Sequence, residues 1–332
     1  MIIQNIKLTN FRNHSKYHLD FKPDTTLILG ANGCGKTSVL EAIYILTRGK
    51  SFRATDPEII KKGTPFYHIE LQYNNGQKST ATYDGTTKTF LIADKKAHRL
   101  PSKHKHPIVL FEPQDLNLIT GSPTRHRDYF DNIFSQLNED YASLINKYKK
   151  AKEQRNKLLK SDVCTPVNLF SWNLLLAKYG TKIFKYRNFF TNQINQSLNQ
   201  VYHSIAENSD QIQINYLSKA KNLTESEFLK KLEESKEKDL ILGYTTFGIS
   251  SDDYNFIFNN KNASTTASRG ESRSIVLALK FIESHLLEQK LHARPIVLLD
   301  DVFSELDNSR RKCLVKNFKN HQVIITSVED IK

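Results

Sequence analysis

A phosphate-loop motif constrains the fold of this chain more than any other feature. Residues Gly30–Thr37 fit the pattern G-x-x-x-x-G-K-[ST] at every fixed position. The loop follows a short apolar run, Thr25–Leu29, that predicts a strand, and it precedes apolar residues at helical spacing. This strand–loop–helix order predicts an α/β fold. The alternative is a glycine-rich turn with a chance lysine, and the full match in its proper context disfavours it.

The residue types of the loop suit the binding of ATP with Mg²⁺. Glycines let backbone N–H groups turn toward the phosphates, and the helix that follows adds its positive N-terminal end. Lys36 can reach the β- and γ-phosphates, and the Thr37 hydroxyl can hold Mg²⁺. The expected nucleotide contacts in the loop are Gly30, Ala31, Asn32, Gly33, Cys34, Gly35, Lys36, Thr37 and Ser38.

A second apolar run near the other end of the chain carries two carboxylates. Ile296–Leu299 predicts a buried strand, and Asp300 and Asp301 follow at its C-terminal end, where α/β sheets place ligands. We expect Asp300 to coordinate Mg²⁺, directly or through water, and Asp301 to orient or deprotonate the attacking water. An aspartate reaches one methylene less far than a glutamate, which predicts slow ATP hydrolysis. Alternatively, both acids cap the next turn, but the phosphate loop upstream favours the site.

The segment Ser268–Glu271 precedes an amphipathic helix and forms a third candidate. A serine hydroxyl and a glycine N–H at a helix N-terminus can bind an anion. Taken alone, the segment is an ordinary helix N-cap with an acidic first turn. Its place, roughly thirty residues before the paired aspartates, favours a second ATP-facing motif.

Charge points to a polyanionic partner. The chain has 332 residues, with 48 Lys+Arg against 35 Asp+Glu, a formal net charge of +13 and a pI of about 9.4. Nucleic acid is the first candidate and an anionic membrane surface the second, whereas the plain alternative is simply a basic soluble protein. Basic clusters occur at Lys95–Lys96, at His98–Arg99 with Lys103 and Lys105, and at Lys147–Lys152. Each could track phosphates or form a solvated face.

Several absences favour a cytoplasmic protein. The N-terminus lacks a signal-peptide pattern, and no apolar run is long enough to span a membrane. The three cysteines, Cys34, Cys164 and Cys313, are scattered without metal-ligand spacing and indicate free thiols in a reducing compartment.

Periodicity changes along the chain and suggests three parts. Strand and turn patterns dominate the start, helical spacing begins near Asn138, and strand-like alternation returns at Tyr254–Phe258. We predict an ATPase lobe with the phosphate loop at 1–112, a mostly helical lobe at 113–262, and a completing segment at 263–332 with the helix that follows Ser268–Glu271 and the aspartate strand. The absence of long heptad arrays argues against a long coiled coil.

The motif order resembles ABC-type ATPases, and within that class the RecF family of bacterial recombination mediators related to SMC proteins. The stretches that carry the resemblance are Asn10–Asn13, Gly33–Thr37 with Leu40–Ile43, Ser51–Arg53, Pro113–Leu116, Gly121–Asp131, Ala267–Glu271 with Leu277–Lys280, and Leu299–Asp307. The resemblance implies an ABC-type head, with a mixed sheet and antiparallel N-terminal strands, that carries an inserted helical domain. The chain departs from the family pattern at Cys34, Gln114, His126 and Ile249–Ser251.

The resemblance also implies a mechanism. Two molecules would sandwich two ATPs, and Ser268, Gly270 and Glu271 of each would face the nucleotide of the other. ATP would thus favour a homodimer, and slow hydrolysis would release it. Gln114 would sense nucleotide between the lobes, although a solvated loop glutamine fits equally well.

The implied partners are DNA, RecO and RecR. DNA would be duplex or a single-strand/double-strand junction held by its backbone, since we find no base-reading motif. The implied role is recombinase loading at gaps during repair, replication restart and the response to DNA damage (the SOS response).

Three other functions remain possible on the sequence alone. One is another SMC-like head, which the lack of long heptads disfavours. Another is the ATPase subunit of a membrane transporter, disfavoured by Asp301 where transporters carry glutamate and by Thr326–Val328 where a switch histidine is expected. The third is a nucleotide-dependent scaffold that does not hydrolyse ATP, which Asp301 does not exclude.

Overall fold

The computed structural model describes residues 2–161 and 165–328. The chain forms two compact units, one built from residues 1–116 and 283–332, the other from 117–282. The helix α9 (Arg269–Leu291) runs from the second unit into the first. The predicted three-part division at 112/113 and 262/263 stays a prediction.

The first unit contains a four-stranded parallel sheet, which includes the strand before the phosphate loop and the strand that ends in Asp300. Its order is β3 (Thr25–Leu29), β13 (Val323–Ser327), β12 (Ile296–Asp300) and β8 (Ile108–Phe111). The last three strands are buried throughout, as the strands of a parallel sheet covered on both faces usually are. Pairing of Asp300 with Thr326, and of Thr326 with Ile28, brings three carboxyl ends to one edge.

An antiparallel sheet forms the rest of this unit's β-structure. Its strand order is β2 (His14–Asp20), β1 (Ile3–Phe11), β4 (Tyr67–Tyr73), β5 (Lys78–Tyr83), β6 (Lys88–Ile92) and β7 (Lys95–Ala97). Buried and half-buried positions alternate along β4, with Ile69, Leu71 and Tyr73 buried, as in a strand that turns one face to the core. The mixed α/β fold with antiparallel N-terminal strands is thereby confirmed.

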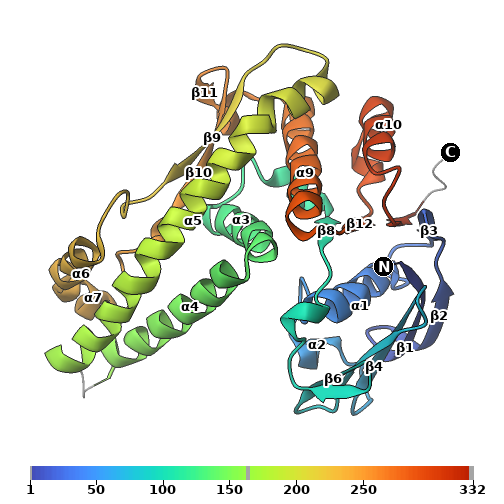
Figure 1. The fold of residues 1–332 in the computed structure, drawn as a ribbon, viewed down its shortest axis with the longest axis horizontal. Helices are drawn as coiled ribbons and strands as arrows, with labels where there is room; N and C mark the ends of the chain where they lie inside the picture. The colour runs from blue at the N-terminus through green and yellow to red at the C-terminus, as the bar shows by residue number, and fades with distance from the viewer. Residues whose placement is uncertain (1, 162–164, 329–332) are drawn as a thin grey trace. The chain divides into compact units, whose positions relative to one another are not determined.

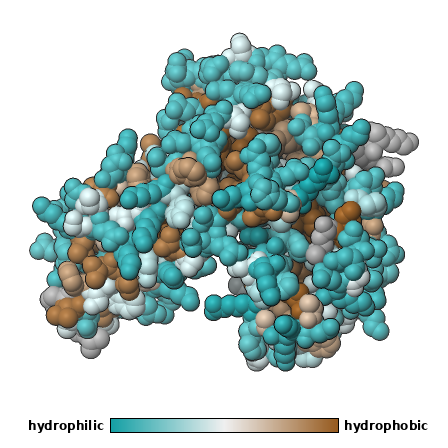
Figure 2. Space-filling view, in the orientation of Figure 1, coloured by the Kyte–Doolittle hydropathy of each residue, from teal (hydrophilic) through white to brown (hydrophobic). Residues whose placement is uncertain are grey.

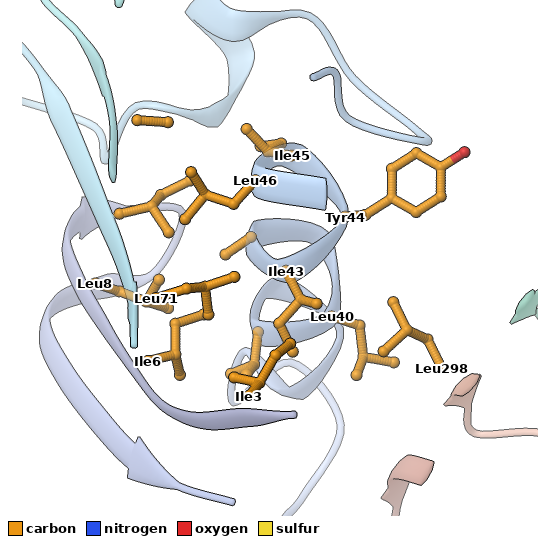
Figure 3. Close-up of a cluster of buried hydrophobic side chains, with 14 of the residues drawn as sticks. Ile3, Ile6, Leu8, Leu40, Ile43, Tyr44, Ile45, Leu46, Leu71 and Leu298 are labelled. Carbon is orange, nitrogen blue, oxygen red and sulfur yellow. The ribbon is translucent and has the colours of Figure 1, made fainter. Parts of the chain in front are cut away.

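The helix α1 (Lys36–Arg48) fills the core of the first unit. It is buried on nearly every side, and Figure 3 shows Leu40 beside Leu298 and Ile43 near Ile3. Gly49, in the left-handed region at φ 85°, ends the helix and donates its N–H to Ile45 O. Shorter elements complete the unit: α2 (Asp56–Ile59), the 3₁₀ turns η1 (Ser102–His104), η2 (Pro113–Asn117) and η4 (Phe303–Glu305), and α10 (Asn308–Asn317).

The second unit is mostly helical, as predicted. It contains α3 (Pro123–Leu137), α4 (Glu139–Leu159), α5 (Pro166–Ala206), α6 (Glu225–Glu234), α7 (Lys236–Leu242), α8 (Ala263–Thr266) and the 3₁₀ turn η3 (Ile249–Ser251). A small antiparallel sheet joins β9 (Ile212–Leu217), β10 (Asp253–Phe258) and β11 (Lys261–Asn262). Helices α4 and α5 pack side by side (Figure 1).

The helix α5 joins two segments that the sequence pattern separates. Periodicity predicts helices around 174–183 and 194–205, and the structure has one helix of 41 residues. Gly180 lies inside it, and a Cβ there would come 2.6 Å from the Phe228 ring. A glycine costs helix stability of about 1 kcal/mol relative to alanine, and here it allows α6 to pack closely against α5.

A buried ion-pair network crosses the second unit. The Arg187 guanidinium is 2% exposed and pairs with Asp131 and Asp252, each at 2.9 Å. It also donates to Ile249 O at 2.9 Å. Tyr141 and Tyr216 donate to the same two carboxylates.

The visible face of the molecule is mostly hydrophilic (Figure 2), although apolar side chains are exposed on α7 and at the start of α5. Ile241 is 84% exposed and Val167 75%. Among the described residues, no helix has both the length and the apolar character needed to cross a membrane.

Candidate nucleotide-binding site

The phosphate loop has the backbone geometry that its glycines predict. Gly33 and Gly35 lie in the left-handed region, at φ 82° and 99°, and Gly35 caps α1. A Cβ on Gly35 would come 2.4 Å from His14 Nε2, whereas one on Gly33 would meet nothing within 4 Å. His14 Nε2 lies 3.1 Å from Gly35 O. The loop therefore needs Gly35 for its dihedral and for the close approach of β2.

Lys36 lies across the loop. Its ammonium donates to Gly30 O at 2.6 Å and to Ala31 O at 3.0 Å, and the residue is buried. Asn13 Nδ2 donates to Gly33 O at 3.0 Å, which ties the turn between β1 and β2 to the same loop. The loop carbonyls thus hold the one positive charge of the motif where a phosphate would meet it.

Thr37 and Asp300 meet although they lie on different elements. Thr37 Oγ1 donates to Asp300 Oδ1 at 2.7 Å, and Thr326 Oγ1 donates to the same oxygen at 2.9 Å. Thr37 is in the first turn of α1, Asp300 ends β12, and Thr326 lies on the neighbouring strand β13. The parallel register, which pairs Asp300 with Thr326, produces this arrangement.

Asp301 has a strained backbone and an unsatisfied carboxylate oxygen. Its φ is 52°, and its N–H donates to Thr326 Oγ1 at 3.0 Å. Its Oδ1 is buried and has no hydrogen-bond partner among the described residues. Burial raises the pKa of Asp301, the charge of Lys36 lowers it, and the neighbouring Asp300 raises it again. A buried acceptor without a donor is the feature expected of a carboxylate that binds a water or a ligand.

These side chains fit an Mg²⁺ site that is completed by the nucleotide. Mg²⁺ takes oxygen ligands and in nucleotide sites uses one or two protein oxygens plus phosphate oxygens and waters. Thr37 Oγ1 and Asp300 Oδ1 supply two adjacent oxygens. No cluster of three or more His, Cys, Asp or Glu that could hold a metal occurs within residues 2–161 and 165–328. Any metal here would therefore depend on the phosphates.

An ion pair at the second turn of α1 was not expected as part of the site. Arg12 donates to both carboxylate oxygens of Glu41, at 2.8 and 2.7 Å, and Glu41 is fully buried in α1. Ser51 Oγ also donates to Glu41 at 2.5 Å. A glutamate among the apolar residues of a helix that is buried all round was the available signal, because such a charge needs a partner.

Ser268, Gly270 and Glu271 lie in the second unit, at the start of α9. Ser268 N donates to the Glu271 carboxylate at 2.6 Å, and Glu271 N donates to Ser268 Oγ at 3.2 Å, which is a capping box. Ser268 is exposed and Gly270 half-buried.

Gln114 is exposed on η2 in the first unit. The structure thus gathers Lys36, Thr37, Asp300 and Asp301 at one edge of the parallel sheet. The roles of Ser268, Gly270, Glu271 and Gln114 stay predictions.

His126, a departure from the family pattern, and its neighbour Arg127 both have hydrogen-bond partners. His126 Nδ1 lies 2.7 Å from Asp253 Oδ1, and its Nε2 lies 2.9 Å from Leu118 O. Arg127 donates to Asp252 O at 2.7 Å. Cys34 and Cys313 are not joined to another cysteine of the described residues, and Cys164 lies outside those residues.

Comparison with known proteins supports the predicted family. Residues 1–327 match the family model described as an AAA ATPase domain. The DNA replication and repair protein RecF of Clostridioides difficile (strain 630) is 32% identical over 99% of this chain and 92% of that protein. The protein of the same name from Clostridium perfringens (strain SM101 / Type A) is 31% identical over 100% of this chain and 94% of its own.

Solved structures agree. The structure of the recombination mediator protein RecF-ATP in the RecFOR pathway superposes with a TM-score of 0.88 at 28% identity, covering 100% of this chain and 93% of that one. An SMC head bound to the C-winged helix domain of ScpA has a TM-score of 0.55 at 16% identity, covering 99% and 90% of the two chains, and shows a shared fold alone. The chain is therefore an ATPase that belongs to the RecF family of DNA replication and repair proteins.

Proposed function

We propose that this chain is an ATP-dependent DNA clamp that dimerises on ATP and acts at gapped or duplex DNA in repair. The observation that carries the proposal is the contact of Thr37 with Asp300 beside Lys36, in a chain of the RecF family. That contact joins the phosphate loop to the acidic strand end, and both are needed to bind ATP with Mg²⁺.

Each residue of the edge has a distinct role in the proposal. When ATP binds, the Lys36 ammonium donates to the β- and γ-phosphates in place of the carbonyl oxygens of Gly30 and Ala31. Thr37 and Asp300 hold Mg²⁺, which when bound neutralises charge on the phosphates. Asp301, with its free Oδ1 and raised pKa, accepts a hydrogen bond from the attacking water and takes its proton.

Dimerisation is proposed to involve the start of α9. Ser268 and Gly270 of one molecule contact the γ-phosphate held by the other, and Glu271 keeps the Ser268 turn in place through the capping box. Only the triphosphate reaches both surfaces, so hydrolysis removes the contact that favours the dimer. Gln114 senses the nucleotide from η2.

DNA is proposed to bind by its phosphates. The net charge of +13 suits a backbone-tracking surface. Lys95 and Lys96 are exposed on β7, and Lys147 and Lys150 are exposed on α4. We further propose a cytoplasmic location, the partners RecO and RecR, and a role in the response to DNA damage, all of which follow from family membership.

The test is fluorescence anisotropy of a labelled gapped duplex, titrated with protein at physiological salt, with and without Mg-ATP. Tighter binding with Mg-ATP is expected, and Lys36→Ala should remove the increase while keeping the nucleotide-free affinity. Equal DNA affinity of the native protein with and without Mg-ATP would contradict the ATP-dependent clamp. DNA binding would then be explained by the net positive charge of the chain alone.

A further inference from the structure

A cavity of about 420 Å³ lies within the helical unit, away from the residues of the phosphate loop in sequence. Its polar lining comes from the start of α3, one face of α4, Arg187 of α5, and η3. The side chains that could contact a ligand are those of Thr124, Arg127, Lys149, Lys152, Asn156 and Ser250. Pockets that bind small ligands are usually about 300–1,000 Å³, so the volume suits a ligand larger than a single water.

Three cations of the lining have no carboxylate partner among the described residues. No ion pair within 4.0 Å joins Arg127, Lys149 or Lys152 to an acid there. Two acids of the lining are already paired: Asp131 with Arg187, which also lines the cavity, and Glu153 with Lys157, which does not. Asp128, the remaining acid, is exposed. With Arg187 included, the lining has four cations against three acids, an excess of one positive charge.

The cations are held close to one another. Lys149 and Lys152 are three residues apart on α4 and so share a helix face. Burial and the charge of Arg127 lower the pKa of Lys152, and the charge of Asp239, which pairs with Arg155, raises it in part. Arg127 is fixed by bonds to Asp252 O at 2.7 Å and to Thr124 Oγ1 at 2.9 Å, which leaves further N–H donors of its guanidinium available. Like charges gathered in a partly buried site repel one another unless an anion joins them.

Neutral donors complete the lining. Asn156 Oδ1 accepts from Thr245 N at 2.9 Å and from Thr245 Oγ1 at 2.7 Å. Because a backbone N–H requires an oxygen acceptor, these bonds fix the amide orientation and leave the Nδ2 donors of Asn156 for a ligand. Thr124 lies in the first turn of α3, where backbone N–H groups favour an anion.

We propose that this cavity is a second phosphate-binding site, which takes a phosphoryl group between Arg127, Lys149 and Lys152. Charge-assisted hydrogen bonds from a guanidinium and two ammonium groups suit the oxygens of a phosphate. The phosphate could belong to a nucleic-acid backbone or to a free phosphorylated compound, since both offer the same oxygens. The site needs neither ATP nor a dimer, so it stands apart from the proposed clamp.

The four lysines of the basic run on α4 form two pairs, one that lines the cavity and one that does not. Lys149, which is exposed, and Lys152, which is half-buried, line it, whereas Lys147 and Lys150, both exposed, do not. Lys149→Gln with Lys152→Gln is therefore the test variant, and Lys147→Gln with Lys150→Gln is the control with the same loss of charge. Both are made in a Lys36→Ala background, which weakens phosphate binding at the loop.

Inorganic pyrophosphate is titrated into both variants and into the parent by calorimetry. The affinity should fall about tenfold or more in the cavity variant, as expected when two charge-assisted hydrogen bonds are lost, and should stay unchanged in the control. Thermal unfolding of the two variants should coincide, which excludes a folding defect. Equal pyrophosphate affinity in both variants would overturn the proposal.

Duplex DNA then separates the two sources of the phosphate. If a backbone phosphate enters the cavity, DNA affinity falls more in the cavity variant than in the control, and its salt slope decreases by about one further unit per lost contact. If the ligand is a free phosphorylated compound, pyrophosphate affinity falls only in the cavity variant, and its DNA affinity falls no more than that of the control, whose two lysines belong to the surface proposed for DNA. Either result supports a phosphate site, and only the identity of its ligand differs.

Discussion

Thr37 and Asp300 are 263 positions apart in the chain and are joined by a hydrogen bond of 2.7 Å. The bond connects the first turn of the phosphate-loop helix to the end of the aspartate strand. Thr326 reaches the same carboxylate oxygen from the adjacent strand. Two hydroxyl groups thus share one acceptor, and they permit an experiment that separates metal binding from simple positioning.

Thr37→Val should remove most of the Mg²⁺ dependence of ATP binding, because the isosteric valine lacks the metal-ligating oxygen. The Mg²⁺ enhancement of ATP affinity should fall about tenfold or more, as measured with a fluorescent ATP analogue. Thr326→Val removes the other hydroxyl at Asp300 and should have the smaller effect. Equal effects of the two substitutions would assign Thr37 a positioning role only.

Ser268→Arg should spare ATP binding and block ATP-driven dimerisation. Ser268 is exposed in the second unit, so an arginine there adds bulk and charge without disturbing a core. Light scattering with and without Mg-ATP measures the oligomeric state, and Ser264→Arg, at an exposed position of α8, is the control. Normal ATP-dependent dimers of Ser268→Arg would refute the proposed contact of Ser268 with the partner's ATP.

Asp301 should control both the rate and the pH dependence of ATP hydrolysis. Asp301→Asn should lower the turnover about a hundredfold or more, as loss of a general base does. Asp301→Glu should raise it, because the extra methylene extends the carboxylate toward the water. ATP affinity should change little in either variant.

The raised pKa of Asp301 gives that prediction a sign in pH. A base works only when deprotonated, so hydrolysis should fall as pH decreases through this pKa. The acidic limb should therefore lie at higher pH than the ordinary aspartate pKa of 3.8 would place it. A pH profile of turnover that shows no acidic limb above that value would contradict the role.

Gly35→Ala should weaken ATP binding more than Gly33→Ala. Both positions have positive φ, which costs an alanine about 1–2 kcal/mol, but only the Cβ at Gly35 approaches His14 closely. Adding His14→Ala to Gly35→Ala should restore affinity to the level of Gly33→Ala. Calorimetric titration of ATP measures all three, and a double variant no better than Gly35→Ala would show that the clash is irrelevant.

Arg187→Met should destabilise the helical unit by about 3–5 kcal/mol, because it leaves the buried carboxylates of Asp131 and Asp252 without their cation. Urea unfolding followed by circular dichroism measures the loss. Lys185→Met, an exposed position on the same helix, should change the free energy of unfolding by less than about 0.5 kcal/mol. Similar losses in both variants would mean that the network contributes no more than a surface lysine.

The sequence alone determined the elements that depend on local pattern. The phosphate loop, the helix that follows it and the aspartate strand are each specified by residues close together in the chain, because backbone dihedrals and hydrophobic periodicity act over a few residues. Gly35 is an example, since its dihedral could be expected from the motif. The family also followed from such short motifs and their order.

Only the tertiary structure decided which distant residues meet. The sharing of Asp300 between Thr37 and Thr326 depends on the strand order and register of the parallel sheet. The pairing of Arg12 with Glu41 joins a strand end to a helix 29 positions away. Contacts of this kind arise from the packing of whole elements against one another, and no local rule of dihedral or periodicity encodes them.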